Sequence, residues 1–231
     1  MRTGFRSCIL SLVLFTAATR AADPNAPHHL RWEPAIAKFE ARDKTNPPPR
    51  DAVLLIGSSS IVKWTNAPAQ FPEHKIINRG FGGSELGDSA AFVERIVIPY
   101  HPKLVMLYAG DNDIAAGKTA ERVFAAFQDF VRKTHAALPH TPIAYLSIKP
   151  SPSREKFLPQ IREANRLIRE FIATDRRLIY VDVFTPMQDA NGHPRRELFV
   201  ADMLHLNADG YKLWAGIVKP VLDKVDPPAA Q

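Results

Sequence analysis

Cysteine is nearly absent from this sequence, because Cys8 is the only one among 231 residues. A single cysteine excludes a disulfide framework within the chain and a zinc site built from thiolates. Long apolar runs are missing as well, and none reaches the roughly 18 residues that a transmembrane helix needs. The hydrophobic content of 45% is nevertheless sufficient for a buried core, so the chain is not intrinsically disordered. Its length excludes two large domains.

Basic clusters are also few. The formal net charge is +6, but Arg2, Arg6 and Arg20 lie in the first 22 residues, where no acidic residue offsets them. Without these three arginines, 27 basic residues face 24 acidic ones. This near-neutral balance gives little support for binding nucleic acid or another polyanion. Nothing in the sequence indicates the oligomeric state.

Residues 1–22 are typical of an export signal peptide. Arg2 and Arg6 precede a short apolar segment at 8–15, and several alanines follow it. A short buried first helix is the alternative interpretation. Cys8 stands at the start of the apolar segment, whereas a lipid-accepting cysteine would follow it, so we expect no lipid anchor. We therefore expect an exported protein, periplasmic or secreted, without stable membrane insertion.

The remaining residues, 23–231, are expected to form a single domain with its core at about 50–222. Five short apolar runs in it are typical of buried strands. These runs are 52–57, 75–78, 104–109, 142–147 and 178–183. The segments between them have helical spacing, for example Val123, Phe127 and Val131 on one face. Strands that are apolar on both faces and alternate with helices predict a parallel sheet covered on both sides. The predicted fold is α/β, a flavodoxin-like three-layer α/β/α sandwich with a five-stranded parallel sheet.

Two further helices are expected at the ends of this domain. One lies between the proline-rich stretches 23–30 and 46–49 and carries Trp32 and Phe39 on its apolar face. The other begins near Asn207, whose side chain is a good N-cap.

Four polar clusters fall at the predicted carboxyl edge of the sheet, where open parallel sheets bind their ligands. On its own, each cluster has an ordinary interpretation as a helix cap, a turn or a solvated pair. Together they supply the parts of an acyl-transfer site. The clusters are Gly57-Ser58-Ser59-Ser60, Asn78-Arg79-Gly80-Phe81-Gly82-Gly83-Ser84, Gly110-Asp111-Asn112-Asp113 and Asp202-Met203-Leu204-His205.

The chemistry of acyl transfer assigns a role to each cluster. A serine hydroxyl is a weak nucleophile until a base removes its proton, and the base needs an acid to orient it. Ser59, His205 and Asp202 can fill these roles. The tetrahedral oxyanion needs donors that already point at it, and the N–H groups of Ser59 and Gly83 and the amide of Asn112 can supply them. Asp113 is expected to brace the loop of Asn112 rather than to transfer a proton.

The sequence resembles the SGNH hydrolases, also called GDSL-type esterases and lipases. The four blocks of this superfamily carry Ser, Gly, Asn and His in that order, and Ser59, Gly83, Asn112 and His205 occupy the matching positions over about residues 50–222. One difference is that the family's Gly-Asp-Ser-Leu is replaced here by Gly-Ser-Ser-Ser. Either neighbouring serine is therefore an alternative nucleophile to Ser59.

The resemblance implies a cofactor-free, metal-free serine esterase with Ser59, Asp202 and His205 as its catalytic residues. Its oxyanion hole would consist of Ser59, Gly83 and Asn112. Members of this superfamily deacylate lipids, simple esters and O-acetylated carbohydrates. We expect a short acyl group, acetyl above all, on a carbohydrate or another small-molecule alcohol. Five residues in or next to the four clusters or the fourth strand are candidates for lining the substrate site. They are Arg79, Phe81, Leu86, Lys149 and Pro150.

Two alternative functions use the same fold. In a metal-dependent phosphoesterase, Asp111, Asp113, Asp202 and His205 would bind a divalent ion, but the serine and glycine clusters would then have no role. A non-catalytic glycan-binding module would keep the fold without turnover.

Overall fold

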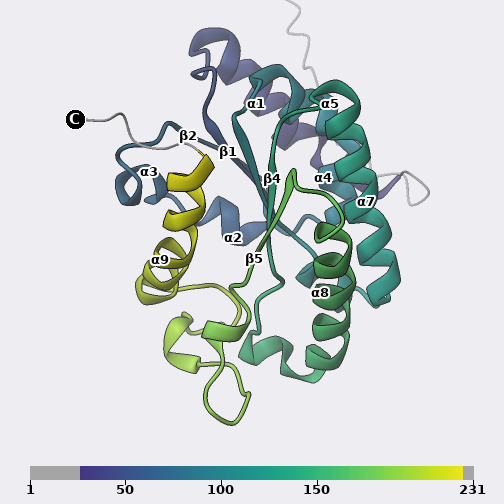
Figure 1. Cartoon of the computed structure of the whole chain (residues 1–231), viewed down its shortest axis with the longest axis vertical. Helices are drawn as coiled ribbons and strands as arrows, with labels where there is room; N and C mark the ends of the chain where they lie inside the picture. The colour runs from purple at the N-terminus through teal and green to yellow at the C-terminus, as the bar shows by residue number, and fades with distance from the viewer. Residues whose placement is uncertain (1–26, 226–231) are drawn as a thin grey trace, which may run out of the picture.

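The computed structural model describes residues 27–225, which form a five-stranded parallel sheet with helices on both faces (Figure 1). The strand order is β2-β1-β3-β4-β5, and every neighbouring pair is parallel. This is the order of flavodoxin-like folds, so the predicted three-layer sandwich is confirmed. The predicted signal peptide lies outside the described residues. The strands are β1 (Val53–Gly57), β2 (Ile76–Gly80), β3 (Leu104–Tyr108), β4 (Ile143–Leu146) and β5 (Leu178–Val181).

Helices connect the strands and flank the sheet. The α-helices are α1 (Glu33–Thr45), α2 (Ser59–Val62), α3 (Ala67–Gln70), α4 (Leu86–Ala91), α5 (Val93–Ile96), α6 (Asp111–Ala115), α7 (Ala120–Ala137), α8 (Leu158–Ile172) and α9 (Ala208–Val225). The 3₁₀ helices are η1 (His28–Trp32), η2 (Ile98–Tyr100), η3 (Pro152–Phe157), η4 (Thr185–Met187) and η5 (Arg196–Leu198). None of the helices in the described part of the chain is long and apolar enough to cross a membrane.

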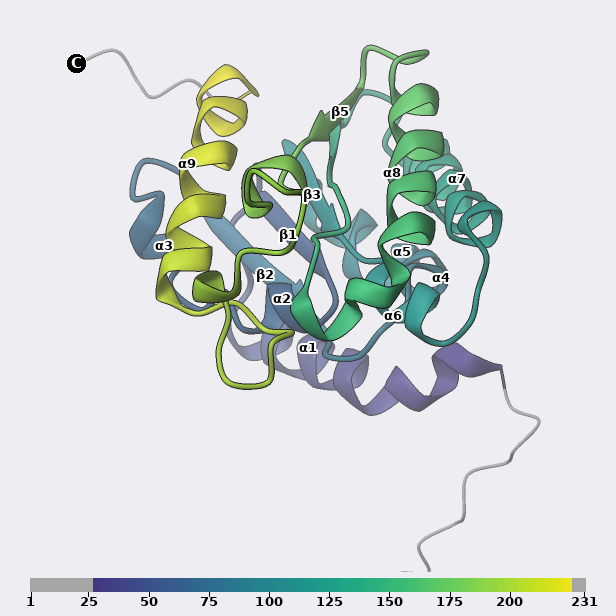
Figure 2. The ribbon, with the colours of Figure 1, turned by 90° about the horizontal axis from the view of Figure 1, so that it is seen from below.

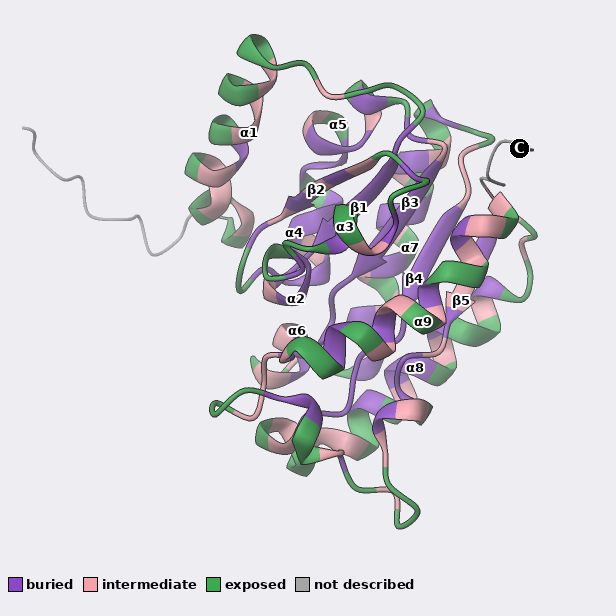
Figure 3. Cartoon of the chain, turned by 90° about the vertical axis from the view of Figure 1, so that its left-hand side faces the viewer, coloured by how far each residue is buried: buried purple, intermediate pink, exposed green. Residues whose placement is uncertain are grey.

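The strands alternate between two separate hydrophobic cores. Leu54 and Ile56 of β1 pack in the core beneath α1, α4, α5, α7 and α8, whereas Val53 and Leu55 face the core beneath α2, α3 and α9. Figure 2 shows these two helical layers on opposite sides of the sheet, and Figure 3 shows that the central strands are buried while the outer helix surfaces are exposed. Burial on both faces explains why β1, β3 and β4 appear in the sequence as continuous apolar runs.

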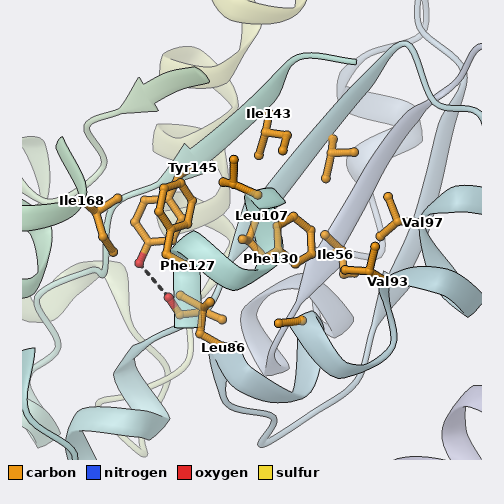
Figure 4. Packing of buried hydrophobic residues seen from close by; sticks show 14 of the residues in the cluster. Ile56, Leu86, Val93, Val97, Leu107, Phe127, Phe130, Ile143, Tyr145 and Ile168 are labelled. Carbon is orange, nitrogen blue, oxygen red and sulfur yellow. Dashed lines mark hydrogen bonds between the residues drawn. The ribbon is translucent and has the colours of Figure 1, made fainter. Parts of the chain in front are cut away.

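Aromatic residues fill much of both cores. In the larger core, Phe127 lies 5.0 Å from Tyr145 between ring centroids, and the Tyr145 hydroxyl donates to the Ala109 carbonyl at 2.8 Å (Figure 4). In the other core, Trp64 stacks on Tyr211 of α9. A buried tyrosine is favourable only when its hydroxyl finds a partner, and the Ala109 carbonyl is that partner for Tyr145.

The two predicted terminal helices are present. Residues 28–45 form η1 and α1, with Trp32 and Phe39 packed against the larger core. Helix α9 starts directly after Asn207, whose Oδ1 accepts a hydrogen bond from the Gly210 N–H at 3.0 Å, as expected of an N-cap. Because Tyr211 of this helix donates to the Ser60 carbonyl at 2.9 Å, α9 is fixed to the turn that carries Ser59.

Candidate active site

The turn after β1 exposes Ser59 at the carboxyl edge of the sheet. Gly57 ends the strand with φ +137°, and a Cβ there would lie 1.8 Å from the Tyr108 carbonyl oxygen of the neighbouring strand. Only glycine allows this approach. The chain then enters α2 with Ser59 as its first residue, so the Ser59 N–H has no partner within the helix.

The turn before α9 brings Asp202 and His205 to the same place. His205 Nε2 lies 3.0 Å from Ser59 Oγ, and its Nδ1 lies 2.6 Å from Asp202 Oδ2. The other Asp202 oxygen accepts the backbone N–H groups of Leu204 and His205, each at 2.9 Å. Burial raises the pKa of Asp202, but the hydrogen bonds from His205 and the backbone outweigh it and hold this pKa far below its usual range. Asp202 is therefore a carboxylate at neutral pH.

The loop of His205 is closed by its own backbone. The Val200 N–H donates to the His205 carbonyl at 2.9 Å, and Phe199 pairs with Leu206 in an antiparallel bridge. The Asn207 amide donates to the carbonyls of Glu197 and Phe199 at 2.7 and 3.2 Å. The imidazole is thus held toward Ser59 by a short, internally bonded loop.

The ambiguity among the three serines is resolved by geometry. Ser58 and Ser60 are buried, and neither hydroxyl has a hydrogen-bond partner among residues 27–225. Ser59 is partly exposed and is the serine in contact with His205.

The predicted oxyanion donors lie in the loops after β2 and β3, which flank β1. A Cβ on Gly82 would lie 3.8 Å from Ser59 Cβ, so the loop that contains Gly83 runs beside the serine. Gly83 has φ +77°, and no residue in the described part of the chain accepts its N–H. Asn112 uses Nδ2 to donate to the Ser84 carbonyl at 3.0 Å. An amide has two such hydrogens, so one is left for a ligand.

Asp113 joins these two loops, as the sequence predicted. Its Oδ2 accepts the Leu86 N–H at 2.9 Å. Burial raises the pKa of Asp113 to about 6, although the bond from Leu86 and the charge of Lys118 act in the opposite direction. This hydrogen bond ties the Asn112 loop to the start of α4, which directly follows the Gly83 loop.

Lys149 was expected to line the substrate site, but it lies inside the protein. Its side chain is 1% exposed, and its Nζ donates to Asp111 Oδ2 at 2.9 Å and to the Tyr108 hydroxyl at 3.1 Å. Burial raises the pKa of Asp111, but the charge of Lys149 and its hydrogen bond outweigh this effect and lower it. Lys149 therefore neutralises a buried carboxylate under the loop of Asn112.

The proposed metal ligands of the phosphoesterase alternative do not converge. Asp111 is paired with Lys149, Asp113 binds a backbone N–H, and Asp202 binds His205. Among residues 27–225, the carboxylates and histidines that lie close enough together to share one ion are instead those of His28, Glu85 and Asp88. Lys118 Nζ already binds Glu85 of that second group at 2.5 Å, and within the group His28 lies 2.8 Å from Asp88.

Three other candidate lining residues are buried. Arg79 is 3% exposed and donates to Asp43 at 2.6 Å and to the Tyr100 hydroxyl at 2.7 Å. Leu86 is fully buried in the larger core, and Pro150 is buried after β4. The prediction was wrong for these three because sequence position at the edge does not reveal how deep a side chain lies.

Phe81 does line a pocket near Ser59. This pocket has a volume of about 620 Å³ and lies between α1 and α2. Its apolar walls include Trp32, Phe39 and Val62, and Gly82 connects it to the serine. The contribution of the first helix was missed, since nothing in the spacing of residues 32–39 indicates which loop they approach. A volume of this size is typical of small-molecule sites.

A parallel α/β sheet with a serine, an imidazole and a carboxylate in contact at its carboxyl edge has the arrangement of a serine hydrolase. The model of the GDSL-like Lipase/Acylhydrolase family matches residues 57–213, which is more than half of the chain. The chain belongs to this family, and membership supports ester hydrolysis as its general activity. No curated protein matches the chain.

Solved structures show the same fold. A GDSL-like lipase from Bacteroides thetaiotaomicron is 18% identical with a TM-score of 0.70, and the match covers 82% of this chain and 97% of that one. A lipase/acylhydrolase from Enterococcus faecalis is 20% identical with a TM-score of 0.62, covering 78% and 98%. A carbohydrate esterase family 3 protein from Talaromyces cellulolyticus is 18% identical with a TM-score of 0.62, covering 75% and 96%.

Proposed function

We propose that the chain is a serine esterase that hydrolyses carboxylic esters through an acyl-serine intermediate on Ser59. The observation that carries the proposal is the continuous contact from Ser59 Oγ to His205 Nε2 at 3.0 Å and from His205 Nδ1 to Asp202 at 2.6 Å. With its Nδ1 proton directed at the Asp202 carboxylate, the neutral imidazole presents a lone pair at Nε2 to the serine.

In this mechanism Ser59 Oγ attacks the ester carbonyl and its proton passes to His205. The oxyanion accepts hydrogen bonds from the N–H groups of Ser59 and Gly83 and from the free amide hydrogen of Asn112. Removing one such donor raises the barrier by roughly 3 to 4 kcal/mol in acyl-transfer enzymes. The alcohol leaves with the proton from His205, and a water molecule then gives a proton to His205 and its oxygen to the acyl carbon. Release of the acid returns the proton to Ser59.

The proposed substrate is a short acyl group, acetyl above all, on a carbohydrate or another soluble alcohol. The structural similarity to a carbohydrate esterase family 3 protein supports this choice. The reaction requires no metal or organic cofactor. The 620 Å³ pocket beside Gly82 is larger than an acetyl group needs, so acyl-chain length is a decisive measurement. Release of acetate from acetylated oligosaccharides is expected to exceed hydrolysis of long-chain aryl esters. A preference for chains of eight or more carbons would reject the short-acyl proposal.

Covalent labelling tests the nucleophile directly. An organophosphonate probe is expected to label the wild-type protein and the Ser60→Ala variant, whose buried hydroxyl has no partner in the described structure. It should not label Ser59→Ala, which is also expected to lose hydrolysis of p-nitrophenyl acetate. Failure to label the wild-type protein would favour the non-catalytic glycan-binding alternative.

We also propose export to the periplasm or the medium, on the basis of the basic and apolar pattern of residues 1–22. Amino-terminal sequencing of the protein isolated from its host should find a start near residue 23. A full-length cytoplasmic product would contradict export.

A further inference from the structure

The segment after β4 carries Arg154 to the edge of the candidate active site. Arg154 belongs to η3, which packs against α6, the helix that begins with Asp111 and Asn112. The preceding residue, Ser153, donates its N–H to the Met203 carbonyl at 3.0 Å, two residues before His205. Arg154 therefore lies between the loop of Asn112 and the loop of His205.

The side chain of Arg154 lacks a protein partner. Its Nε is buried and has no hydrogen-bond acceptor, and its guanidinium forms no ion pair within residues 27–225. A buried guanidinium N–H without an acceptor is unfavourable, because arginine stays charged and cannot shed the proton. The Arg154 side chain as a whole is partly exposed, so its terminal N–H groups can donate hydrogen bonds to a ligand.

The neighbouring carboxylates are already occupied. Lys149 binds Asp111 at 2.9 Å, and His193 binds Glu155 at 2.6 Å. Burial raises the pKa of Asp111, whereas the charge and hydrogen bond of Lys149 and the charge of Arg154 lower it. Lys149 balances the charge of Asp111, so the positive charge of Arg154 has no ion-pair partner within residues 27–225 at the rim of the site.

The position of Arg154 also indicates which part of the substrate it faces. In the proposed mechanism, His205 gives its proton to the leaving alcohol, so the alcohol must lie against the His205 loop. Ser153 is bonded to that same loop. The apolar pocket at Gly82 lies next to Val62 and Trp32, in a different part of the site.

We propose that Arg154 binds a carboxylate on the alcohol portion of the substrate, so that the enzyme prefers acylated acidic sugars to neutral ones. This inference rests on the proposed esterase function. A guanidinium donates two parallel hydrogen bonds to a carboxylate, which provides both attraction and orientation. Arg154 takes no part in proton transfer and determines specificity.

A matched pair of substrates tests the proposal. The methyl glycosides of mono-O-acetylated glucuronic acid and glucose differ only in a carboxylate against a hydroxymethyl group. Wild-type kcat/KM is expected to favour the acidic glycoside by about 10- to 100-fold, the usual range for a hydrogen-bonded charge. Arg154→Ala should abolish this ratio through a higher KM for the acidic glycoside, and Arg154→Lys should restore part of it. The control is Arg176→Ala, an equal charge change at the opposite edge of the sheet before β5, which should keep the wild-type ratio.

The outcomes separate this inference from the esterase proposal. Wild-type hydrolysis without a preference for the acidic glycoside would overturn the role of Arg154 alone. An equal loss on both glycosides in Arg154→Ala would show a merely structural role and would also overturn it. If the wild-type protein hydrolyses no ester, the esterase proposal fails, and binding of the two unacetylated glycosides then decides the inference. Tighter binding of the glucuronide that is lost in Arg154→Ala would still support it, and equal binding would refute it.

Discussion

Replacing Lys149 with methionine should destabilise the protein strongly, since it breaks a buried ion pair. The Lys149 and Asp111 side chains are 1% and 4% exposed, and their charged atoms lie 2.9 Å apart. Methionine keeps much of the volume of lysine but leaves the Asp111 carboxylate buried without its counter-charge. Breaking a buried pair by removing one partner costs about 3 to 5 kcal/mol.

The double variant Lys149→Met/Asp111→Asn should recover most of this loss. Asparagine carries no charge and can still accept the Asn112 N–H, which donates to Asp111 Oδ1 at 3.1 Å. Replacing both members of a buried pair with neutral groups is often close to neutral in stability. We expect the double variant to lie within about 2 kcal/mol of the wild-type protein.

The measurement is urea unfolding at pH 8 and pH 5, with Lys212→Met as the control for a lost surface lysine. Lys212 is exposed on α9, so its replacement should change the free energy of unfolding by less than about 0.5 kcal/mol. In Lys149→Met, burial without the lysine raises the pKa of Asp111. The folded state then binds a proton more readily than the unfolded chain, so the loss should be smaller at pH 5 than at pH 8.

Two results would refute the reasoning. A loss in Lys149→Met no greater than that of the surface control would mean that the pair is not desolvated. A double variant as unstable as the single one would mean that lysine contributes through packing rather than through its charge.

Two further predictions concern the other acidic residues of the site. Asp202→Asn places an amide against His205 Nδ1 and favours the tautomer that cannot accept the Ser59 proton, so kcat for p-nitrophenyl acetate should fall by about 100- to 10,000-fold. An unchanged kcat would mean that the imidazole needs no carboxylate. Because the pKa of Asp113 is raised to about 6, the folded state binds its proton more tightly, and this carboxyl reduces stability as pH rises from about 4 to 6. Asp113→Asn should therefore gain stability relative to wild type over that window, by up to about 3 kcal/mol in urea unfolding, and a difference independent of pH would contradict the raised pKa.

The sequence was sufficient for the strands and for the Ser59, Asp202 and His205 cluster. The central strands β1, β3 and β4 are buried on both faces, and their apolar runs are therefore continuous and easy to recognise. The polar residues that follow such runs must lie at the carboxyl edge, because all the strands are parallel. The topology and the internally bonded loop before α9 then bring residues 59 and 205 together, although 146 positions separate them.

The basic residues near the strand ends could not be interpreted in the same way. Arg79 lies near the end of β2 and Lys149 follows β4, which are positions where a substrate-binding residue would be expected. Each is instead paired with a carboxylate from an earlier part of the chain. The partners Asp43 and Asp111 precede them by 36 and 38 positions. No local pattern encodes such a pairing, since it depends on which side chains meet after the sheet has formed.

Arg154 was not recognised from the sequence for a similar reason, because its role also depends on which side chains meet in the fold. It stands in a proline- and serine-rich connector, which has no periodicity from which its orientation could be inferred. Its significance comes from the absence of a partner within the described structure, while Arg79 and Lys149 have theirs. A buried basic residue with a carboxylate beside it stabilises the fold, whereas a partly exposed one such as Arg154, without a carboxylate, can offer its hydrogen bonds to a ligand. Whether a basic residue near the site can bind substrate therefore depends on whether the fold pairs it with a carboxylate of the protein.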